Sequence, residues 1–192
     1  MRVPVYIQKR HIHLSQIDAE KLFGKWYVFL LKKKFTQPWE YFTEENITIK
    51  GAKWQIENID IIMPYRKFTQ VEILESDNKI LWINAKITPS WNLKDAEPLI
   101  LIWPKWNIYL EHTAIISENH IHMSVAQSKD FGFKHNQYVN VRIPRNNNKI
   151  INHVKIRTND KYEFDFHLNS DEGAKFWLKT NDRAEIIQIK ED

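Results

Sequence analysis

Two His-Ile-His triplets are the residues of this 192-residue chain that are best suited to chemistry. Alternate residues of a β-strand share one face, so His11 and His13 can converge on one ion, and so can His120 and His122. Neutral imidazole is a good ligand for zinc and related divalent metals. A single pair of this kind also fits two solvent-facing histidines on a strand. The repetition of the triplet in a similar local context favours metal binding.

Each histidine pair needs further ligands, and two residues in strand-like segments could supply them. Glu72 in FTQVEI offers a carboxylate, and His167 in YEFDFHLNS offers an imidazole. Spacing alone favours an exposed strand carboxylate for Glu72 and a hydrogen-bonded core histidine for His167. Arg66 and Arg157 are candidates for binding phosphate, because a guanidinium can donate two parallel hydrogen bonds to an oxyanion. An ordinary surface charge is the alternative for both arginines.

Composition narrows the class of protein. The chain contains no cysteine, which excludes disulfides, thiolate metal ligands and a cysteine nucleophile. The net charge of +4 comes from 28 basic and 24 acidic residues, and the basic residues are dispersed. A solvated surface explains this pattern better than a nucleic-acid interface. No apolar run approaches the ~20 residues of a transmembrane helix, and the first residues lack a signal-peptide pattern.

Strand signals dominate the chain. Runs rich in β-branched residues surround turns in NITIKGAKWQIENIDIIM, PLILIWPKWNIYLEH and YVNVRIPRNNNKIINHVKIRT. Short helices are expected at Ser15–Phe23 and near Asp171–Leu178. Many short strands without a long amphipathic helix indicate small barrels or sandwiches.

An internal echo indicates a duplication. The segment RHIHLSQIDAEKLFG (Arg10–Gly24) resembles NHIHMSVAQSKDFG (Asn119–Gly132). A second match pairs KWQIENIDIIMPYR, which ends at Arg66, with NNKIINHVKIR, which ends at Arg157. We therefore expect two copies of one β-rich unit, each with a histidine pair and a later arginine.

Tryptophan and glycine occur at unusual frequencies. The chain has 8 Trp and only 4 Gly, whereas glycine normally makes up about 7% of residues. In LIWPKWNIYL (Leu101–Leu110), a strand–turn–strand pattern, two Trp flank the Pro-Lys pair of the turn. Tight turns favour Gly, Asn or Asp, so the largest side chains stand where the smallest is expected.

Five motifs together carry a family resemblance: VPVYIQKRHIHLSQIDAEKLFG, QPWEYFTEENITIKGAKWQIENI, PYRKFTQVEI, ISENHIHMS and VKIRTNDKYEFDFHLNSDE. They resemble the PduL-type phosphotransacylases, the phosphate propanoyltransferase family, and the resemblance is collinear to about Leu178. Members transfer an acyl group between coenzyme A and phosphate. The resemblance implies a mainly β fold of two small β-barrels with short capping helices. Residues 1–9 and 118–190 would form one barrel, and residues 10–117 the other.

The same resemblance implies two metal ions between the barrels, taken as zinc, with cobalt or another divalent metal as the alternative. One ion would be held by His11, His13 and Glu72, and the other by His120, His122 and His167. Arg66 is expected to bind phosphate as a catalytic residue, and Ser90 and Arg157 to line the substrate site. Asn119 stands where the family commonly has arginine, and it receives no role.

The resemblance also bears on the tryptophans, because all eight fall where glycine is expected in the family: Trp26, Trp39, Trp54, Trp82, Trp91, Trp103, Trp106 and Trp177. We hypothesise that a UGA codon, translated here as Trp, is read as Gly in the source organism. Eight genuine Trp in a divergent homologue are the alternative. The hypothesis predicts that most of them lie in turns or at helix ends, several with positive φ, and that few form the core.

The predicted function is a metal-dependent phosphate acyltransferase that interconverts acyl-CoA and acyl phosphate, with acetyl or propanoyl as the acyl group. The alternatives are another zinc-dependent acyl-transfer or hydrolytic enzyme, or a non-catalytic metal-binding homologue. We expect a cytoplasmic homodimer in acetate or energy metabolism, with no nucleic-acid or membrane partner. The family-like first strand begins at Val3, so no microcompartment-targeting extension is expected.

Overall fold

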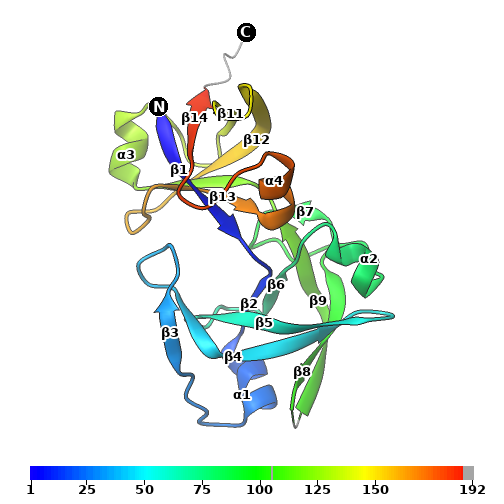
Figure 1. Cartoon of the computed structure of the whole chain (residues 1–192). Coiled ribbons are helices and arrows are strands. Elements are labelled where there is room, and N and C mark those ends of the chain that lie inside the picture. Colours follow the sequence, from blue (N-terminus) through cyan, green and yellow to red (C-terminus); the bar gives the residue numbers. More distant parts are fainter. Residues whose placement is uncertain (105, 188–192) are drawn as a thin grey trace. The chain divides into compact units, whose positions relative to one another are not determined.

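The computed structural model describes residues 1–104 and 106–187, which divide into two units. Unit 1 contains Met1–Gln8, Thr36–Pro38 and the described residues from Glu118 onward. Unit 2 contains Lys9–Phe35 and Trp39–Ser117. Unit 1 therefore combines the first strand, one short segment from the middle of the chain and the described residues after Ser117 (Figure 1).

Unit 1 is a closed barrel with the strand order β1-β13-β10-β12-β11-β14. Its strands are β1 (Arg2–Gln8), β10 (His120–Met123), β11 (Tyr138–Ile143), β12 (Lys149–Thr158), β13 (Asp165–Asn169) and β14 (Arg183–Ile187). Two short helices, α3 (Val125–Asp130) and α4 (Ser170–Lys175), belong to the same unit. Strand β1 pairs in parallel with β13 and antiparallel with β14, so the N-terminal strand closes a barrel whose other strands follow Glu118.

Unit 2 contains a second closed ring, in which the pairings run β2-β5-β4-β8-β9-β6 and return to β2. These strands are β2 (His11–His13), β4 (Tyr41–Lys50), β5 (Gln55–Met63), β6 (Gln70–Glu72), β8 (Glu97–Trp103) and β9 (Trp106–Ser117). Strands β3 (Leu31–Lys34) and β7 (Ile87–Thr88) pair with β4 and β9, and the helices are α1 (Gln16–Phe23) and α2 (Asp77–Leu81). The predicted mainly β architecture of two small barrels with short helices is confirmed.

The repeated triplet forms the same local structure in both units. Ile12 and Ile121, the middle residues of the triplets, are fully buried in the apolar cores of their own barrels. A serine follows each triplet as a helix N-cap: the Ser15 hydroxyl accepts from the Asp18 N–H at 3.2 Å, and the Ser124 hydroxyl accepts from the Gln127 N–H at 3.1 Å. The predicted helix at Ser15–Phe23 is confirmed, and α4 occupies the second predicted position.

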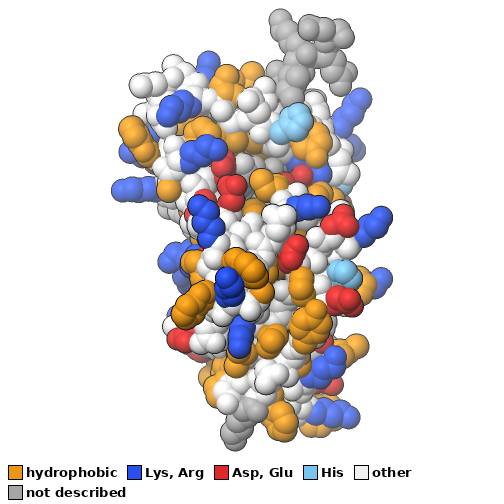
Figure 2. Space-filling model, turned by 90° about the vertical axis from the view of Figure 1, so that its right-hand side faces the viewer, with side chains coloured by type: hydrophobic (Ala, Val, Ile, Leu, Met, Phe, Trp, Pro, Cys, Tyr) orange, Lys and Arg blue, Asp and Glu red, His pale blue; other side chains and the backbone are white. Residues whose placement is uncertain are grey.

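On the face drawn in Figure 2, the described basic and acidic side chains are interspersed and form no continuous basic stripe. Among the described residues, no helix has both the length and the apolar character needed to cross a membrane.

The tryptophans lie where the recoding hypothesis requires. Six of them are in turns or loops or just beyond a helix, and Trp103 and Trp106 end the paired strands β8 and β9. The six most exposed are Trp26, Trp54, Trp82, Trp91, Trp106 and Trp177. Trp103 is partly buried against the core of unit 2, and Trp39 is half-buried. Positive φ occurs at Trp26 (75°), Trp82 (57°) and Trp177 (56°).

Two helices of unit 1 end in the same motif with different residues at the critical position. After α3, the Gly132 N–H donates to the Lys129 carbonyl at 3.2 Å, and the Phe133 N–H donates to the Ser128 carbonyl at 2.8 Å. After α4, the Trp177 N–H donates to the Ala174 carbonyl at 3.1 Å, and the Leu178 N–H donates to the Gly173 carbonyl at 2.8 Å. This is the Schellman motif, whose left-handed residue is usually glycine because a Cβ is unfavourable there.

The first prediction tests the backbone argument. Trp26→Gly should raise the free energy of unfolding by roughly 1 kcal/mol, because a non-glycine residue in the left-handed region costs on the order of 1–3 kcal/mol, partly offset by glycine's entropy in the unfolded chain. Trp54→Gly is the matched control: Trp54 is also exposed but its φ is not positive, so this change should destabilise slightly. Chemical denaturation of the three proteins measures the difference. Equal destabilisation by both substitutions would contradict the argument.

The second prediction concerns the codon itself. Protein isolated from the source organism should carry glycine at the eight positions, so each peptide that spans one of them should be lighter by the mass difference between Trp and Gly. Peptide mass spectrometry measures this directly. Tryptophan masses at these positions would refute the recoding and leave a divergent sequence with eight genuine Trp.

Candidate metal centres

Strand pairing in unit 2 gathers His11, His13 and Glu72. In the antiparallel pair β2–β6, His11 stands opposite Glu72 and His13 stands opposite Gln70. Residues directly opposite each other project to the same face of a sheet, so all four side chains share one face. The two imidazole rings are 5.0 Å apart between centroids, and His11 Nε2 lies 3.7 Å from Glu72 Oε2. One donor atom each from the two histidines and Glu72 lies within 4.8 Å of the others.

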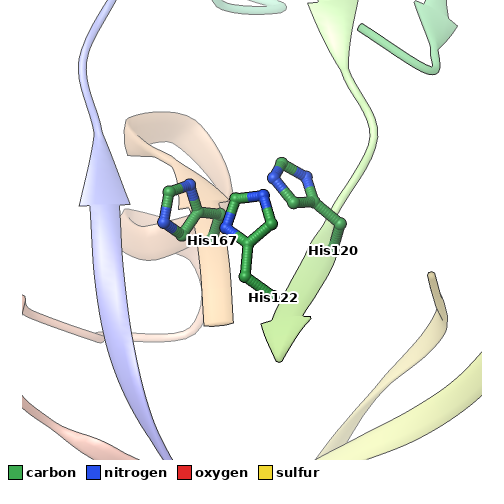
Figure 3. A group of neighbouring side chains, drawn as sticks. All are labelled: His120, His122 and His167. Atoms are coloured by element: carbon green, nitrogen blue, oxygen red, sulfur yellow. The ribbon is translucent and has the colours of Figure 1, made fainter. Parts of the chain in front are cut away.

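The equivalent pairing in unit 1 gathers three histidines. In the antiparallel pair β10–β13, His120 stands opposite His167 and His122 stands opposite Asp165. The three rings gather between these strands (Figure 3), with centroid separations of 4.6–5.1 Å. Their donor atoms also lie within 4.8 Å of one another, and all three side chains are buried. The structure thus brings together both sets of residues that the sequence singled out.

The first histidine of each triplet is oriented in the same way. His11 Nδ1 lies 3.0 Å from the Lys9 carbonyl oxygen, and His120 Nδ1 lies 2.8 Å from the Glu118 carbonyl oxygen. A carbonyl oxygen only accepts hydrogen bonds, so each Nδ1 must carry the proton. The lone pair is then on Nε2 of both rings, which is the arrangement that a metal-binding imidazole requires.

Second contacts hold Glu72, His122 and His167, and sequence reasoning missed the residues that make them. Gln70 Nε2 donates to Glu72 Oε1 at 2.6 Å. In unit 1, Asp165 lies 3.0 Å from His122 Nδ1 and 2.8 Å from His167 Nε2. Both residues stand two positions before a predicted ligand, so strand alternation could have identified them. Gln37, which contacts Asp165, has no comparable sequence signal because it comes from a distant segment.

Each histidine group has an arginine close enough to act on it electrostatically. Arg66 Nη2 donates to Glu40 at 3.2 Å and Nη1 donates to Gln70 at 3.2 Å, and its side chain is 34% exposed. Arg157 is buried on β12 opposite His122, with Nη2 3.6 Å from Glu118 Oε1. The arginines are not equivalent positions of the duplication, because in the parallel pairs Asp60 faces His11 and Lys155 faces His120. The second sequence match was therefore wrong in register.

Ser90 is the predicted site residue that the structure does not link to either group through the contacts described above. It lies in the turn after β7, is buried, and has its hydroxyl 3.1 Å from that of Ser117. Asn119 accepts a backbone hydrogen bond from the Lys155 N–H at 3.1 Å. This contact uses the main chain and gives the Asn119 side chain no role.

Burial keeps several of these imidazoles neutral. It lowers the pKa of His13 and of His120 well below the usual value, and the nearby guanidinium of Arg66 or Arg157, respectively, adds to the effect. Burial also lowers the pKa of His122 to about 4, although its hydrogen bond to Asp165 opposes the shift. Neutral imidazole is the form that binds a metal, so the protein presents the ligand-competent form at neutral pH.

The third prediction follows from these lowered pKa values. An unfolded chain protonates its histidines near pH 6.5, whereas His13, His120 and His122 stay neutral in the folded metal-free protein to lower pH. The unfolded state therefore binds more protons than the folded state between about pH 6.5 and pH 4. Lowering the pH through this window should reduce the free energy of unfolding by up to about 1.4 kcal/mol per pH unit for each histidine. Urea denaturation in the presence of a chelator, at pH 7, 6 and 5, measures this slope.

The control for this prediction is the double variant His120→Asn, His122→Asn, which should show a shallower slope than the parent chain. Stability that is constant or rising from pH 7 to pH 5 in the parent chain would contradict the buried neutral histidines.

Comparison with known proteins gives a consistent result. The family model described as phosphate propanoyltransferase matches residues 4–179. Three proteins named phosphate propanoyltransferase are among the relatives. The one from Lachnoclostridium phytofermentans is 36% identical over 171 residues, which cover 88% of this chain and 80% of the relative. The one from Thermotoga maritima is 33% identical over 186 residues, covering 96% and 89%. The one from Salmonella typhimurium is 33% identical over 171 residues, covering 88% and 81%.

The matched range includes every residue of both candidate metal groups, as well as Arg66 and Arg157. The resemblance seen in the sequence is confirmed: the chain belongs to the phosphate propanoyltransferase family of phosphate acyltransferase enzymes.

Proposed function

We propose that this protein is a metal-dependent phosphate acyltransferase that interconverts acyl-CoA plus phosphate with acyl phosphate plus CoA. The observation that carries the proposal is the pair of buried three-residue groups, His11–His13–Glu72 and His120–His122–His167, each with donor atoms within 4.8 Å of one another. We favour propanoyl as the acyl group because the relatives are named for propanoyl transfer, and acetyl is proposed beside it on the family resemblance alone.

The donor sets fit a divalent ion of the zinc type. One group offers two imidazoles and a carboxylate and the other offers three imidazoles, which are common ligand sets for catalytic zinc with one position left for substrate or water. Among the described residues, His11 Nε2 is buried with no hydrogen-bond partner, and Glu72 Oε2 lies 3.7 Å from it. An ion beside this nitrogen would relieve the cost of burying it without a hydrogen-bond partner. Zinc is proposed first and cobalt second, since both accept this chemistry.

The arginines support phosphate as the second substrate. The guanidinium of Arg66 has five N–H donors, and its contacts to Glu40 and Gln70 use two of them. The side chain is partly exposed and lowers the pKa of His13, so its charge is felt at the candidate ligands. We propose that Arg66 orients phosphate, and that Arg157 supplies positive charge for an anionic part of the substrates beside His120. Ser90 is retained as a proposed substrate contact on the resemblance alone.

The reaction needs no covalent enzyme intermediate. A phosphate oxygen attacks the thioester carbonyl, the carbon–sulfur bond breaks, and CoA leaves as a thiolate. When bound, a divalent ion can polarise that carbonyl and stabilise the thiolate. The protein's own tasks are to hold phosphate beside the thioester, to keep its imidazoles neutral, and to supply fixed positive charge where negative charge develops. The absence of cysteine from the chain is consistent with this direct transfer.

Hydrolysis of acyl-CoA on the same donor set is the alternative activity, and a non-catalytic metal-binding role is the alternative outside the enzymes. Retention of both donor groups and of Arg66 favours catalysis over a decayed homologue. The cytoplasmic location and the homodimer expected from the resemblance stay predictions.

The fourth prediction tests the function. The protein supplied with zinc should form acyl-CoA from acetyl or propanoyl phosphate and CoA, and removal of metal with a chelator should abolish turnover. His13→Ala should lower kcat/KM by more than about 100-fold, because loss of a metal ligand costs at least as much as loss of a residue that supports one. His112→Ala, an exposed histidine of the same unit, should change kcat/KM by less than about twofold.

Each assay should be run on the chain as written and on a version with glycine at the eight Trp positions. CoA release from acyl-CoA, measured with and without phosphate, separates transfer from hydrolysis. A soluble, metal-loaded Gly version without turnover on either acyl phosphate would overturn the proposed function.

A further inference from the structure

The two histidine groups follow one plan, and comparing them draws attention to Asp165. In unit 2, the strand opposite the histidine pair carries Gln70 and Glu72 on the shared face. In unit 1, the corresponding positions are Asp165 and His167. Asp165 thus has the place of Gln70, two residues before a candidate ligand. The carboxylate is buried, with 11% of its side chain exposed.

The two oxygens of Asp165 contact different nitrogens of two rings. Oδ1 lies 3.0 Å from Nδ1 of His122, and Oδ2 lies 2.8 Å from Nε2 of His167. An ionised carboxylate only accepts hydrogen bonds, so both of these nitrogens must carry a proton. The lone pairs of the neutral rings then lie on Nε2 of His122 and on Nδ1 of His167. One carboxylate therefore fixes opposite tautomers in two neighbouring histidines.

Gln37 holds the carboxylate in turn. Its Nε2 donates to both Asp165 oxygens, at 3.3 and 3.1 Å, and lies 3.2 Å from His122 Nδ1, which donates to the same carboxylate. Its Oε1 accepts from the Glu163 N–H at 3.1 Å. The backbone contact fixes which end of the amide faces the carboxylate. Gln37 is only 1% exposed and belongs to the short segment Thr36–Pro38 that lies with unit 1. Thr36 of the same segment places Oγ1 3.1 Å from His167 Nε2, as a second acceptor for that N–H.

We propose that Asp165, clamped by Gln37, is a positioning residue that presents His122 and His167 to a metal ion through opposite ring nitrogens. This inference rests on the proposed metal centre of unit 1. Its physical basis is that a neutral imidazole has one lone pair, and a free ring exchanges it between two nitrogens. A fixed hydrogen bond on the far nitrogen keeps the lone pair on the metal side. Asparagine cannot replace this carboxylate, because its amide offers one accepting and one donating atom where two acceptors are needed.

The fifth prediction is made on the whole protein with zinc as the probe. In competition with a chromophoric chelator, the parent chain should bind two equivalents of zinc. Asp165→Asn should weaken one equivalent by roughly 10–100-fold and leave the other, at His11, His13 and Glu72, unchanged. Asp160→Asn, which alters an exposed turn carboxylate of the same unit, is the matched control and should leave both equivalents unchanged.

A second readout does not require a variant. Nitrogen NMR of the zinc-loaded parent protein should show the proton on Nδ1 of His122 and on Nε2 of His167. If Asp165→Asn fails to fold, Gln37→Met removes the amide that binds Asp165 and lies beside His122, and it should weaken the same single equivalent. The same protonated nitrogen in both rings, or two unweakened equivalents in folded Asp165→Asn, would overturn the positioning role. A parent chain that binds no zinc would overturn the metal centre itself and the role that depends on it.

Discussion

The antiparallel register of one strand pair in each barrel is the constraint on which both histidine groups depend. The register sets His11 opposite Glu72 and His120 opposite His167. A slip by one residue would turn every side chain of the strand to the other face and separate the donors. What opposes such a slip is packing on the opposite face, where Ile121 and Phe166 are fully buried. Burial of each such side chain contributes about 1.5–3 kcal/mol, so the core fixes the site.

Buried polar groups are tolerated in these sites because most of their hydrogen-bonding atoms have partners. The Lys9 and Glu118 carbonyls, Gln70 and Asp165 each contact a polar atom of a candidate metal ligand. An unsatisfied buried polar group costs about 1–3 kcal/mol, so these contacts stabilise the fold as well as orient the rings. The same network that makes the donor groups compatible with burial also prepares them for a cation. Stability and function therefore draw on the same contacts here.

At several turns and helix ends, this sequence has a tryptophan where the backbone conformation favours glycine. Helix α3 ends in a Schellman motif with Gly132, and helix α4 ends in the same motif with Trp177. The backbone hydrogen bonds of the two motifs match, so the geometry is set by the helix end and not by the side chain. A residue that disfavours the geometry is accommodated because its side chain, 73% exposed, can extend into solvent. Tryptophan at several positions with positive φ is therefore the structural support for the hypothesis that the codon is read as glycine.

The sequence by itself determined the elements and most of the donors. Alternation of apolar and polar residues predicted the strands, and Ser15 after the first triplet predicted the start of α1. The duplicated HIH pairs, with the family motifs, singled out the candidate ligands. These features are local or repeated, so they can be recognised in the sequence. Helix α3 after the second triplet was not predicted.

Tertiary structure decided what depends on contacts between distant residues. It showed that Arg157, not Arg66, lies opposite a triplet residue, because register is a property of paired strands. It also brought Gln37 to Asp165, which is 128 residues away in the sequence. A single contact between such distant residues produces no repeating pattern from which the sequence could predict it.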